Sequence, residues 1–235
     1  MTAEEDLESR WAPVFRDDTV LRKPGFHVIA VDEEIFNWMG WVINYLAMIP
    51  LREPRTVAVV TNSAVAEYAR RLDASMATDV LEKQLLAIAA DKWGSDAYIF
   101  DMMLLDPAHP QLTLDSRVQT FAAGSADLVV WDDSVPGSEM DGGLFAISDE
   151  NGIAAWAGIK CPSPRAQYFQ VATRPDARRR GYARIVASHA VVHLQEQGIT
   201  PYYAYVRGND ASEALARSMG FVPYGFAVIA ESKEN

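Results

Sequence analysis

The sequence RPDARRRGYAR, residues 174–184, combines closely spaced arginines with one glycine. It holds five of the chain's 21 lysine and arginine residues, although the formal net charge of the protein is −11. Asp176 is the only acid within the segment, so we expect its positive charge to remain largely unneutralised. Gly181 lets a backbone approach an anion closely, and guanidinium groups donate paired hydrogen bonds to phosphate oxygens. The segment therefore predicts a site for a phosphorylated ligand.

The sequence on either side places this segment between a strand and a helix. Residues 166–173 (AQYFQVAT) are typical of a strand, and residues 182–197 carry apolar residues at helical spacing. At the start of a helix, unpaired backbone N–H groups and the helix dipole attract negative charge. The spacing Arg178-x-x-Gly181-x-Ala183 is neither a Walker loop nor a dinucleotide fingerprint, because G-x-x-x-x-G-K and G-x-G-x-x-G are absent.

This pattern resembles the pyrophosphate loop of the GCN5-related N-acetyltransferase (GNAT) superfamily, which reads Q/R-x-x-G-x-G/A after a strand of the type V-x-T-x-P. Val171, Thr173 and Pro175 precede the loop in that order. The later sequence NDASEALARSMGF, residues 209–221, is similar to the family's N-x-x-S/A-x-x-L-x-x-x-x-G-F. The resemblance covers roughly residues 143–230 and is closest to the branch that includes zwittermicin-resistance-type acetyltransferases.

The resemblance implies a mixed α+β GNAT fold, an α/β fold with a central, mostly antiparallel sheet splayed at the cofactor site. It also implies acetyl-CoA as co-substrate and an N-acetyltransferase in which an amine attacks the thioester directly in a ternary complex. A backbone N–H near Val171 would polarise the acetyl carbonyl. The residues that it places at the coenzyme are Val171, Thr173, Arg178, Arg179, Arg180, Gly181, Tyr182, Ala183, Asn209 and Ser212.

Two departures from the family pattern concern acid–base catalysis. Ala216 occupies the position where many members carry a tyrosine that protonates the leaving thiolate. The strand before the loop offers Gln167, Tyr168 and Gln170 instead of a glutamate base. The catalytic residues are thus unknown, with Tyr203, Tyr205 and Ser212 as candidates. We expect no essential general acid, because thiols are fairly acidic and aminolysis relies mainly on proximity. A non-catalytic acyl-CoA-binding or regulatory module is the alternative.

The first half of the chain predicts an α/β region that precedes this domain. Expected helices span residues 3–16, 63–73 and 78–90, and expected strands span 26–31, 56–61 and 96–105. The apolar residues 35–51 are interpreted as a buried helix, because they are too few to cross a membrane. Residues 132–143, rich in Pro, Gly and acids, predict a linker between an N-terminal region (1–135), expected to wall the acceptor pocket, and a catalytic domain (143–235).

After the linker, the sequence predicts strands and helices in alternation. Residues 144–149 and 153–160 flank Glu-Asn-Gly and predict a hairpin. Further strands are expected at 201–206 and 225–230, and a short helix at 210–220.

Composition limits the remaining classes of function. A strongly acidic chain repels nucleic acid and anionic membranes, so we expect neither as a partner. The acidic N-terminus lacks a signal-peptide core, and one cysteine, Cys161, cannot form an internal disulfide, which together favour a cytoplasmic protein. The net charge favours a cationic small-molecule amine as acceptor, and the sequence is compatible with a homodimer. His189 and His193 have zinc-ligand spacing, but no Cys or acid converges on them, so no metal is expected.

Overall fold

A computed structural model of the chain describes residues 2–17, 19–31, 36–38, 41–93, 97–108, 110–122, 140, 142–160 and 168–231. Within these residues the helices are α1 (Ala3–Phe15), α2 (Ser63–Ala69), α3 (Thr78–Trp93), α4 (Tyr182–Glu196) and α5 (Asp210–Ser218), with short 3-10 turns η1 (Val20–Arg22) and η3 (Pro175–Ala177). The strands are β1 (Gly25–Ala30), β2 (Phe36–Trp38), β3 (Trp41–Pro50), β4 (Thr56–Thr61), β5 (Ala97–Leu105), β6 (Gln119–Phe121), β7 (Leu144–Asp149), β8 (Gly152–Lys160), β9 (Tyr168–Thr173), β10 (Tyr202–Val206) and β11 (Phe221–Glu231).

The chain divides into two compact units, each of which takes residues from both halves of the sequence. Unit 1 comprises Met1–Met103, Ala204–Asn209 and Pro223–Asn235, and unit 2 comprises Leu104–Tyr203 and Asp210–Val222. Most of the expected linker, residues 132–143, lies outside the described residues. No helix within the described ranges is long and apolar enough to cross a membrane.

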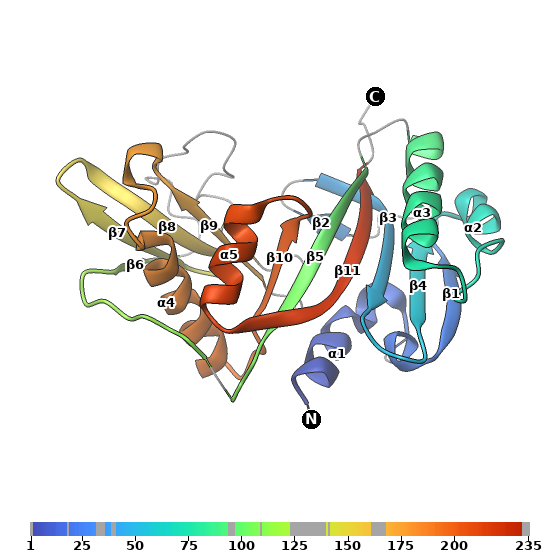
Figure 1. Cartoon of the computed structure of the whole chain (residues 1–235), viewed down its shortest axis with the longest axis horizontal. Helices are drawn as coiled ribbons and strands as arrows, with labels where there is room; N and C mark the ends of the chain where they lie inside the picture. The colour runs from blue at the N-terminus through green and yellow to red at the C-terminus, as the bar shows by residue number, and fades with distance from the viewer. Residues whose placement is uncertain are drawn as a thin grey trace. The chain divides into compact units, whose positions relative to one another are not determined.

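Unit 1 contains most of a seven-stranded sheet. The strand order is β1-β4-β3-β11-β5-β10, with β2 paired to β3. β1 is parallel to β4, whereas β3 is antiparallel to both β4 and β11. Figure 1 shows β11, in red, between β3 and β5, so a strand from the end of the sequence occupies the interior of this sheet.

Helices α2 and α3 cover one face of this sheet. Successive side chains of a strand point to opposite faces, and the odd-numbered positions of β3 and β4 share one core with both helices. That core includes Tyr45, Ala47, Ile49, Val57 and Val59 of the strands, Val65 and Ala69 of α2, and Leu81, Leu85 and Ala89 of α3. The even-numbered Leu46, Met48, Ala58 and Val60 are also fully buried. Both faces of β3 and β4 are therefore covered.

This double burial explains a wrong prediction. The expected buried helix over residues 35–51 is instead β2 and β3, an antiparallel pair with Trp38 opposite Trp41. A strand buried on both faces is apolar at every position, so its sequence lacks the alternation that distinguishes strands from buried helices. Tyr45 is fully buried in the core.

A buried carboxylate joins α1 to the rest of unit 1. Glu8 is 3% exposed and accepts hydrogen bonds from Arg22 Nε at 2.9 Å, from Arg52, and from the Tyr224 hydroxyl at 3.2 Å. Burial, reinforced by the negative charge of Glu8, raises the pKa of Tyr224. Tyr224 therefore remains a protonated donor. These bonds tie together α1, the β3–β4 turn and β11.

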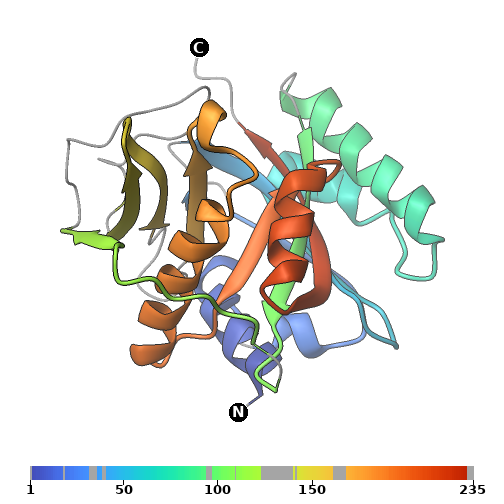
Figure 2. The same ribbon diagram turned by 60° about the vertical axis from the view of Figure 1, so that its left-hand side comes forward.

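Unit 2 is built on an antiparallel four-stranded sheet in the order β6-β7-β8-β9. The predicted hairpin of β7 and β8 is confirmed, with Gly152 at φ 99° after the turn. Helix α4 packs against β7, β8 and β9 (Figure 2). Val186, Ala190 and Leu194 of α4 are fully buried, as their helical spacing predicts. The short strand β6 was not predicted from the sequence.

The remaining sequence predictions differ from the structure by a few residues at element ends. The predicted helices at 3–16, 63–73, 78–90, 182–197 and 210–220 correspond to α1 to α5, and the strands at 26–31, 56–61, 96–105, 144–149, 153–160, 166–173, 201–206 and 225–230 to β1, β4, β5 and β7 to β11. Helix and strand ends are the least certain part of any such prediction.

Leu85→Ala should lower the free energy of unfolding by about 2–5 kcal/mol, because it leaves a cavity between α3 and the sheet. Chemical denaturation of the whole chain measures this loss. Val80→Ala is the matched control on the same helix, since Val80 is 43% exposed and its truncation should change stability by less than about 0.5 kcal/mol. Equal losses at both positions would contradict the packing of α3.

Candidate functional site

The arginine-rich segment forms the connection between β9 and α4 in unit 2. It passes through η3 and reaches α4 at Gly181, which precedes the helix with φ 81°. Arg179 also has a positive φ of 64°, a conformation that L-residues adopt infrequently. Gly181 O accepts from Ile185 N–H at 3.2 Å, so the first N–H groups of α4 have no acceptor within the helix. The turn therefore leaves the first backbone N–H groups of α4 without partners inside the helix.

Arg174 holds this turn against the β7–β8 hairpin. Its Nη2 donates to both carboxylate oxygens of Asp149 at 2.8 and 2.9 Å, and its Nε donates to Asp176 at 2.6 Å. Its Nη1 donates to the carbonyl oxygens of Ile153 at 2.9 Å and Asn151 at 3.2 Å. The side chain is only 14% exposed. Arg174 is thus a structural residue of the loop.

These contacts correct the expectation that the segment keeps its charge unneutralised. The guanidinium of Arg174 holds the pKa of Asp149 and that of Asp176 below the ordinary value of an aspartate. The two carboxylates in turn raise the pKa of Arg174, Asp176 more than Asp149. Asp149 lies 25 residues before Arg174 in the sequence, and only the hairpin brings it to the loop. The sequence segment alone could not reveal this partner.

The other arginines of the segment differ in their exposure and in their hydrogen bonds. Arg184 donates to the carbonyl of Gln111 at 2.7 Å. Arg180 is 51% exposed and lies 3.7 Å from Asp149, a long contact. Arg178 Nε is 3.5 Å from the Thr173 carbonyl. Arg179 is exposed and makes no ion pair or hydrogen bond within the described residues. The exposed guanidiniums beside unpaired helix N–H groups suit a diphosphate ligand.

β9 offers unpaired backbone groups next to this loop. The Arg174 N–H bonds to Ala154 O at 2.9 Å, which fixes which residues face β8. In an antiparallel ladder every second residue pairs inward, so the N–H groups of Val171 and Thr173 point away from β8. β9 is the last strand of its sheet, and within the described chain no strand pairs with that edge. The N–H groups of Val171 and Thr173 therefore have no strand partner within the described residues.

The three tyrosines of β10 are buried, and the ring of Tyr203 contacts other aromatic rings. Tyr202 is fully buried, Tyr203 is 6% exposed and Tyr205 is 7% exposed. The Tyr203 ring contacts Phe169 of β9 at 5.2 Å and Phe221 at 5.9 Å between centroids. β9 and β10 end separate sheets, and these rings join them through side chains. Tyr203 and Tyr205 stay candidates for the catalytic general acid.

The second motif also adopts its predicted local structure. Asn209 is exposed, and its N–H bonds to Val206 O at 3.0 Å in the turn before α5. α5 starts at Asp210, so Asn209 directly precedes the helix. Ser212 is half-buried on its first turn, and Ala216 is completely buried. The structure thus places Ala216 in the core, where a tyrosine would not fit without rearrangement.

The two histidines of α4 make packing contacts. His189 Nε2 accepts from the Asp115 N–H at 3.2 Å, and His193 Nε2 is 2.7 Å from Gln197 Nε2. Both rings also lie near the ring of Phe145. Cys161 and Gln167 lie outside the described residues, as does the side chain of Tyr168.

A segment that the sequence did not single out borders α4. Thr113 N–H donates to the Ser188 hydroxyl at 2.9 Å, and Gln111 accepts from Arg184. The segment around Gln111 and Thr113 thus holds the first half of α4. The only sequence signal near it was its prolines.

The matching family model is described as GNAT acetyltransferase and covers residues 140–225. The ribosomal protein bS18-alanine N-acetyltransferase of Escherichia coli (strain K12) is 30% identical over 78 residues, which are 33% of this chain and 53% of that relative. Its counterpart in Salmonella typhimurium is 30% identical over 76 residues, which are 32% of this chain and 51% of the relative. The chain spans about half the length of these curated relatives.

Solved structures also resemble the chain. A GNAT-family acetyltransferase from Colwellia psychrerythraea has a TM-score of 0.45 at 16% identity, covering 66% of this chain and 63% of that one. A GCN5-related N-acetyltransferase from Kribbella flavida has a TM-score of 0.43 at 19% identity, covering 66% and 64%.

The segment 140–225, which contains the loop, matches the GNAT acetyltransferase family model. The mixed α/β GNAT fold that the sequence predicts is confirmed.

Asp149→Asn should lower the melting temperature at neutral pH, and the difference from the parent protein should shrink as the pH falls. The pKa of Asp149 is lower in the folded than in the unfolded chain, so its ionised form stabilises the fold above the unfolded pKa of about 3.9. That contribution is lost as the pH falls through the folded pKa. Glu150→Gln, in the adjacent exposed turn, should show no such trend. A difference that is constant with pH would contradict the pairing.

Ala216→Tyr should destabilise the protein by about 1–3 kcal/mol, because the buried site has no room for a ring. It should not increase turnover as a restored acid would. Ala214→Tyr is the control, since Ala214 is exposed on the same helix and should tolerate the ring. Equilibrium unfolding of both variants compares them, and a stable, faster Ala216 variant would refute this account.

Proposed function

We propose that this protein transfers an acetyl group from acetyl-CoA to a primary amine of a small molecule, by direct attack within a ternary complex. The observation that carries the proposal is the turn at Arg179 and Gly181, whose left-handed residues open α4 inside the segment that matches the family model. Such a turn suits the coenzyme's diphosphate.

The residues of this chain would bind and orient acetyl-CoA and the amine, and would supply little covalent chemistry. Acetyl-CoA supplies the acyl group as a thioester. The loop amides and the exposed Arg178, Arg179 and Arg180 would hold the diphosphate, and the free N–H of Val171 would polarise the acetyl carbonyl. The amine nitrogen forms the new bond to the carbonyl carbon, the carbon–sulfur bond breaks, and the thiolate departs. The amine's proton passes to the thiolate or to water.

The proposed acceptor is a cationic small-molecule amine. The net charge of −11 favours cationic amines. The curated relatives are named for an alanine of a ribosomal protein, so the amino terminus of a peptide is also a primary amine to test. Antibiotic amines, polyamines and amino acids complete the panel.

A non-catalytic acyl-CoA-binding module is the second candidate. The burial of Ala216 favours it, because this position lacks the family's tyrosine and α5 buries the side chain that replaces it. Turnover distinguishes the two candidates, since both predict coenzyme binding.

The test follows acetyl-CoA consumption against the amine panel, with mass detection of the acetylated product, after coenzyme binding has been measured as a rise in melting temperature. Gly181→Val should abolish the coenzyme-induced rise, because valine disfavours φ 81° and distorts the loop amides. Gly198→Val is the matched control, since Gly198 has φ 70° at the other end of α4 and equal free space. It should lose similar intrinsic stability and keep the coenzyme-induced rise.

An unchanged melting temperature of the parent protein with saturating acetyl-CoA would refute the coenzyme assignment. A normal shift without any acetylated product would favour the binding module.

A further inference from the structure

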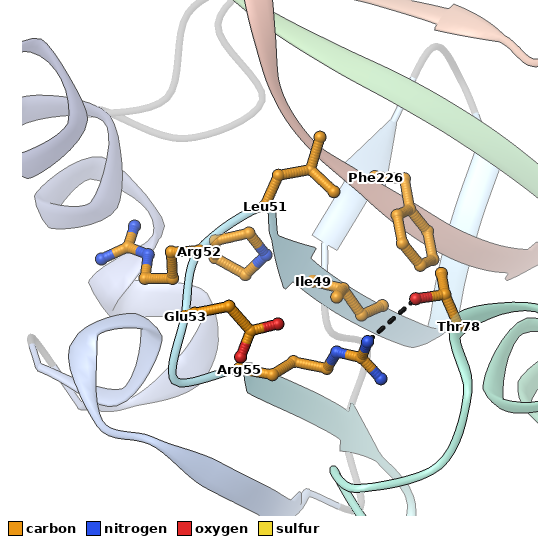
Figure 3. Close-up of a pocket in the computed structure, with 8 residues that line it drawn as sticks. Ile49, Leu51, Arg52, Glu53, Arg55, Thr78 and Phe226 are labelled. Atoms are coloured by element: carbon orange, nitrogen blue, oxygen red, sulfur yellow. Dashed lines mark hydrogen bonds between the residues drawn. The ribbon is translucent and has the colours of Figure 1, made fainter.

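Unit 1 contains a pocket of about 280 Å³ at the turn between β3 and β4 (Figure 3). Its apolar lining comes from Ile49, Leu51 and Phe226, and its polar lining includes Glu53, Arg55 and Thr78. All these residues lie outside the segment 140–225 that matches the family model. The volume is slightly smaller than that of typical ligand sites in proteins and fits a small metabolite better than a nucleotide.

Arg52 borders the pocket but is engaged elsewhere. It pairs with the buried Glu8, and Figure 3 shows its guanidinium directed toward α1 and away from Arg55. The negative charge of Glu8 offsets its positive charge. Arg52 is therefore part of the structural network of α1.

Arg55 crosses the pocket and retains hydrogen-bonding capacity. Its Nη1 donates to the carbonyls of Ala74, at 3.3 Å, and Met76, and its Nη2 donates to Thr78 Oγ1 at 2.9 Å. A guanidinium has five N–H donors. The Nε–H and one Nη2–H remain for a ligand, and no carboxylate of the described chain pairs with Arg55. These contacts fix the side chain in place, so a ligand carboxylate would meet a preorganised cation.

Glu53 supplies the opposite charge. It lies two residues before Arg55, is exposed, and has no hydrogen bond or ion pair within the described residues. Figure 3 shows its side chain projecting from the turn into the region that the Arg55 side chain spans. A lone surface carboxylate is ordinary, but this one borders a cavity that also holds a partly free guanidinium. The pocket thus presents both charges without pairing them to each other.

The apolar lining is partly open and partly rigid. Leu51 is 61% exposed. Phe226 is 2% exposed, and Arg207 lies 5.1 Å from the centre of its ring. Arg207 is in turn fixed by Asp101 and Glu82, at 2.7 and 2.8 Å. A ligand's hydrocarbon group could bury Leu51 against this fixed wall.

We propose that this pocket binds a small zwitterion, an amino acid with an aliphatic side chain. Its carboxylate would accept from Arg55, its ammonium would donate to Glu53, and its hydrocarbon group would contact Leu51 and Ile49. The inference concerns a second ligand site and does not depend on the proposed acetyl transfer.

Isothermal titration of the whole chain without coenzyme tests this proposal, with L-leucine as the probe. Three analogues each remove one feature: 4-methylpentanoate lacks the ammonium, 3-methylbutylamine lacks the carboxylate, and glycine lacks the hydrocarbon group. L-leucine should bind saturably, and each analogue should bind at least tenfold more weakly.

Glu53→Gln should weaken L-leucine binding at least fivefold and leave 4-methylpentanoate unaffected, because only the ammonium contact is lost. Glu67→Gln is the matched control, an exposed glutamate of α2 that does not line the pocket. Melting temperatures of both variants should equal that of the parent. Absence of L-leucine binding at millimolar concentration, equal binding of the analogues, or equal effects of the two variants would each overturn the proposal.

Discussion

The hydrogen bonds of Arg174 fix the position of the loop between β9 and α4. One guanidinium joins the loop to Asp149 at the end of β7 and to two carbonyls of the hairpin turn and β8. Since α4 begins a few residues later, these bonds set where its unpaired N–H groups point. An arginine in the middle of a basic segment thus acts as a structural anchor. Its neighbours Arg178, Arg179 and Arg180 are exposed.

The unpaired backbone groups beside this loop depend equally on where the second sheet ends. β9 has a partner on one side only, so alternate N–H groups along it remain unsatisfied by the fold. An edge of this kind is a liability for a soluble protein unless something covers it. Here the unpaired groups of Val171 and Thr173 and the amides at Gly181 belong to consecutive parts of one chain segment. A single extended molecule can therefore satisfy both.

The sequence revealed most of this arrangement where the signal was local. The order of strand, loop and helix around Gly181 and the Asn-Gly hairpin follow from residues that are neighbours in the chain. Two features could not be predicted. The strand β3 is apolar on both faces, which hides its period. The pairing of Asp149 with Arg174 needs the hairpin register, which brings together residues 25 positions apart. Composition and residue spacing cannot predict an interaction that depends on tertiary contact.

The interior position of β11 has a consequence for how the protein is made. The ribosome synthesises the chain from the N-terminus onward, so β3 and β5 leave the ribosome long before β11, the strand that pairs between them. Until Phe221–Glu231 is synthesised, two apolar strands expose backbone edges that invite pairing with other chains. Because β11 is far in sequence from its partner strands, its pairing with them is also slower than the formation of a local hairpin. The nascent protein therefore passes through an aggregation-sensitive interval that ends only after Phe221–Glu231 has been translated.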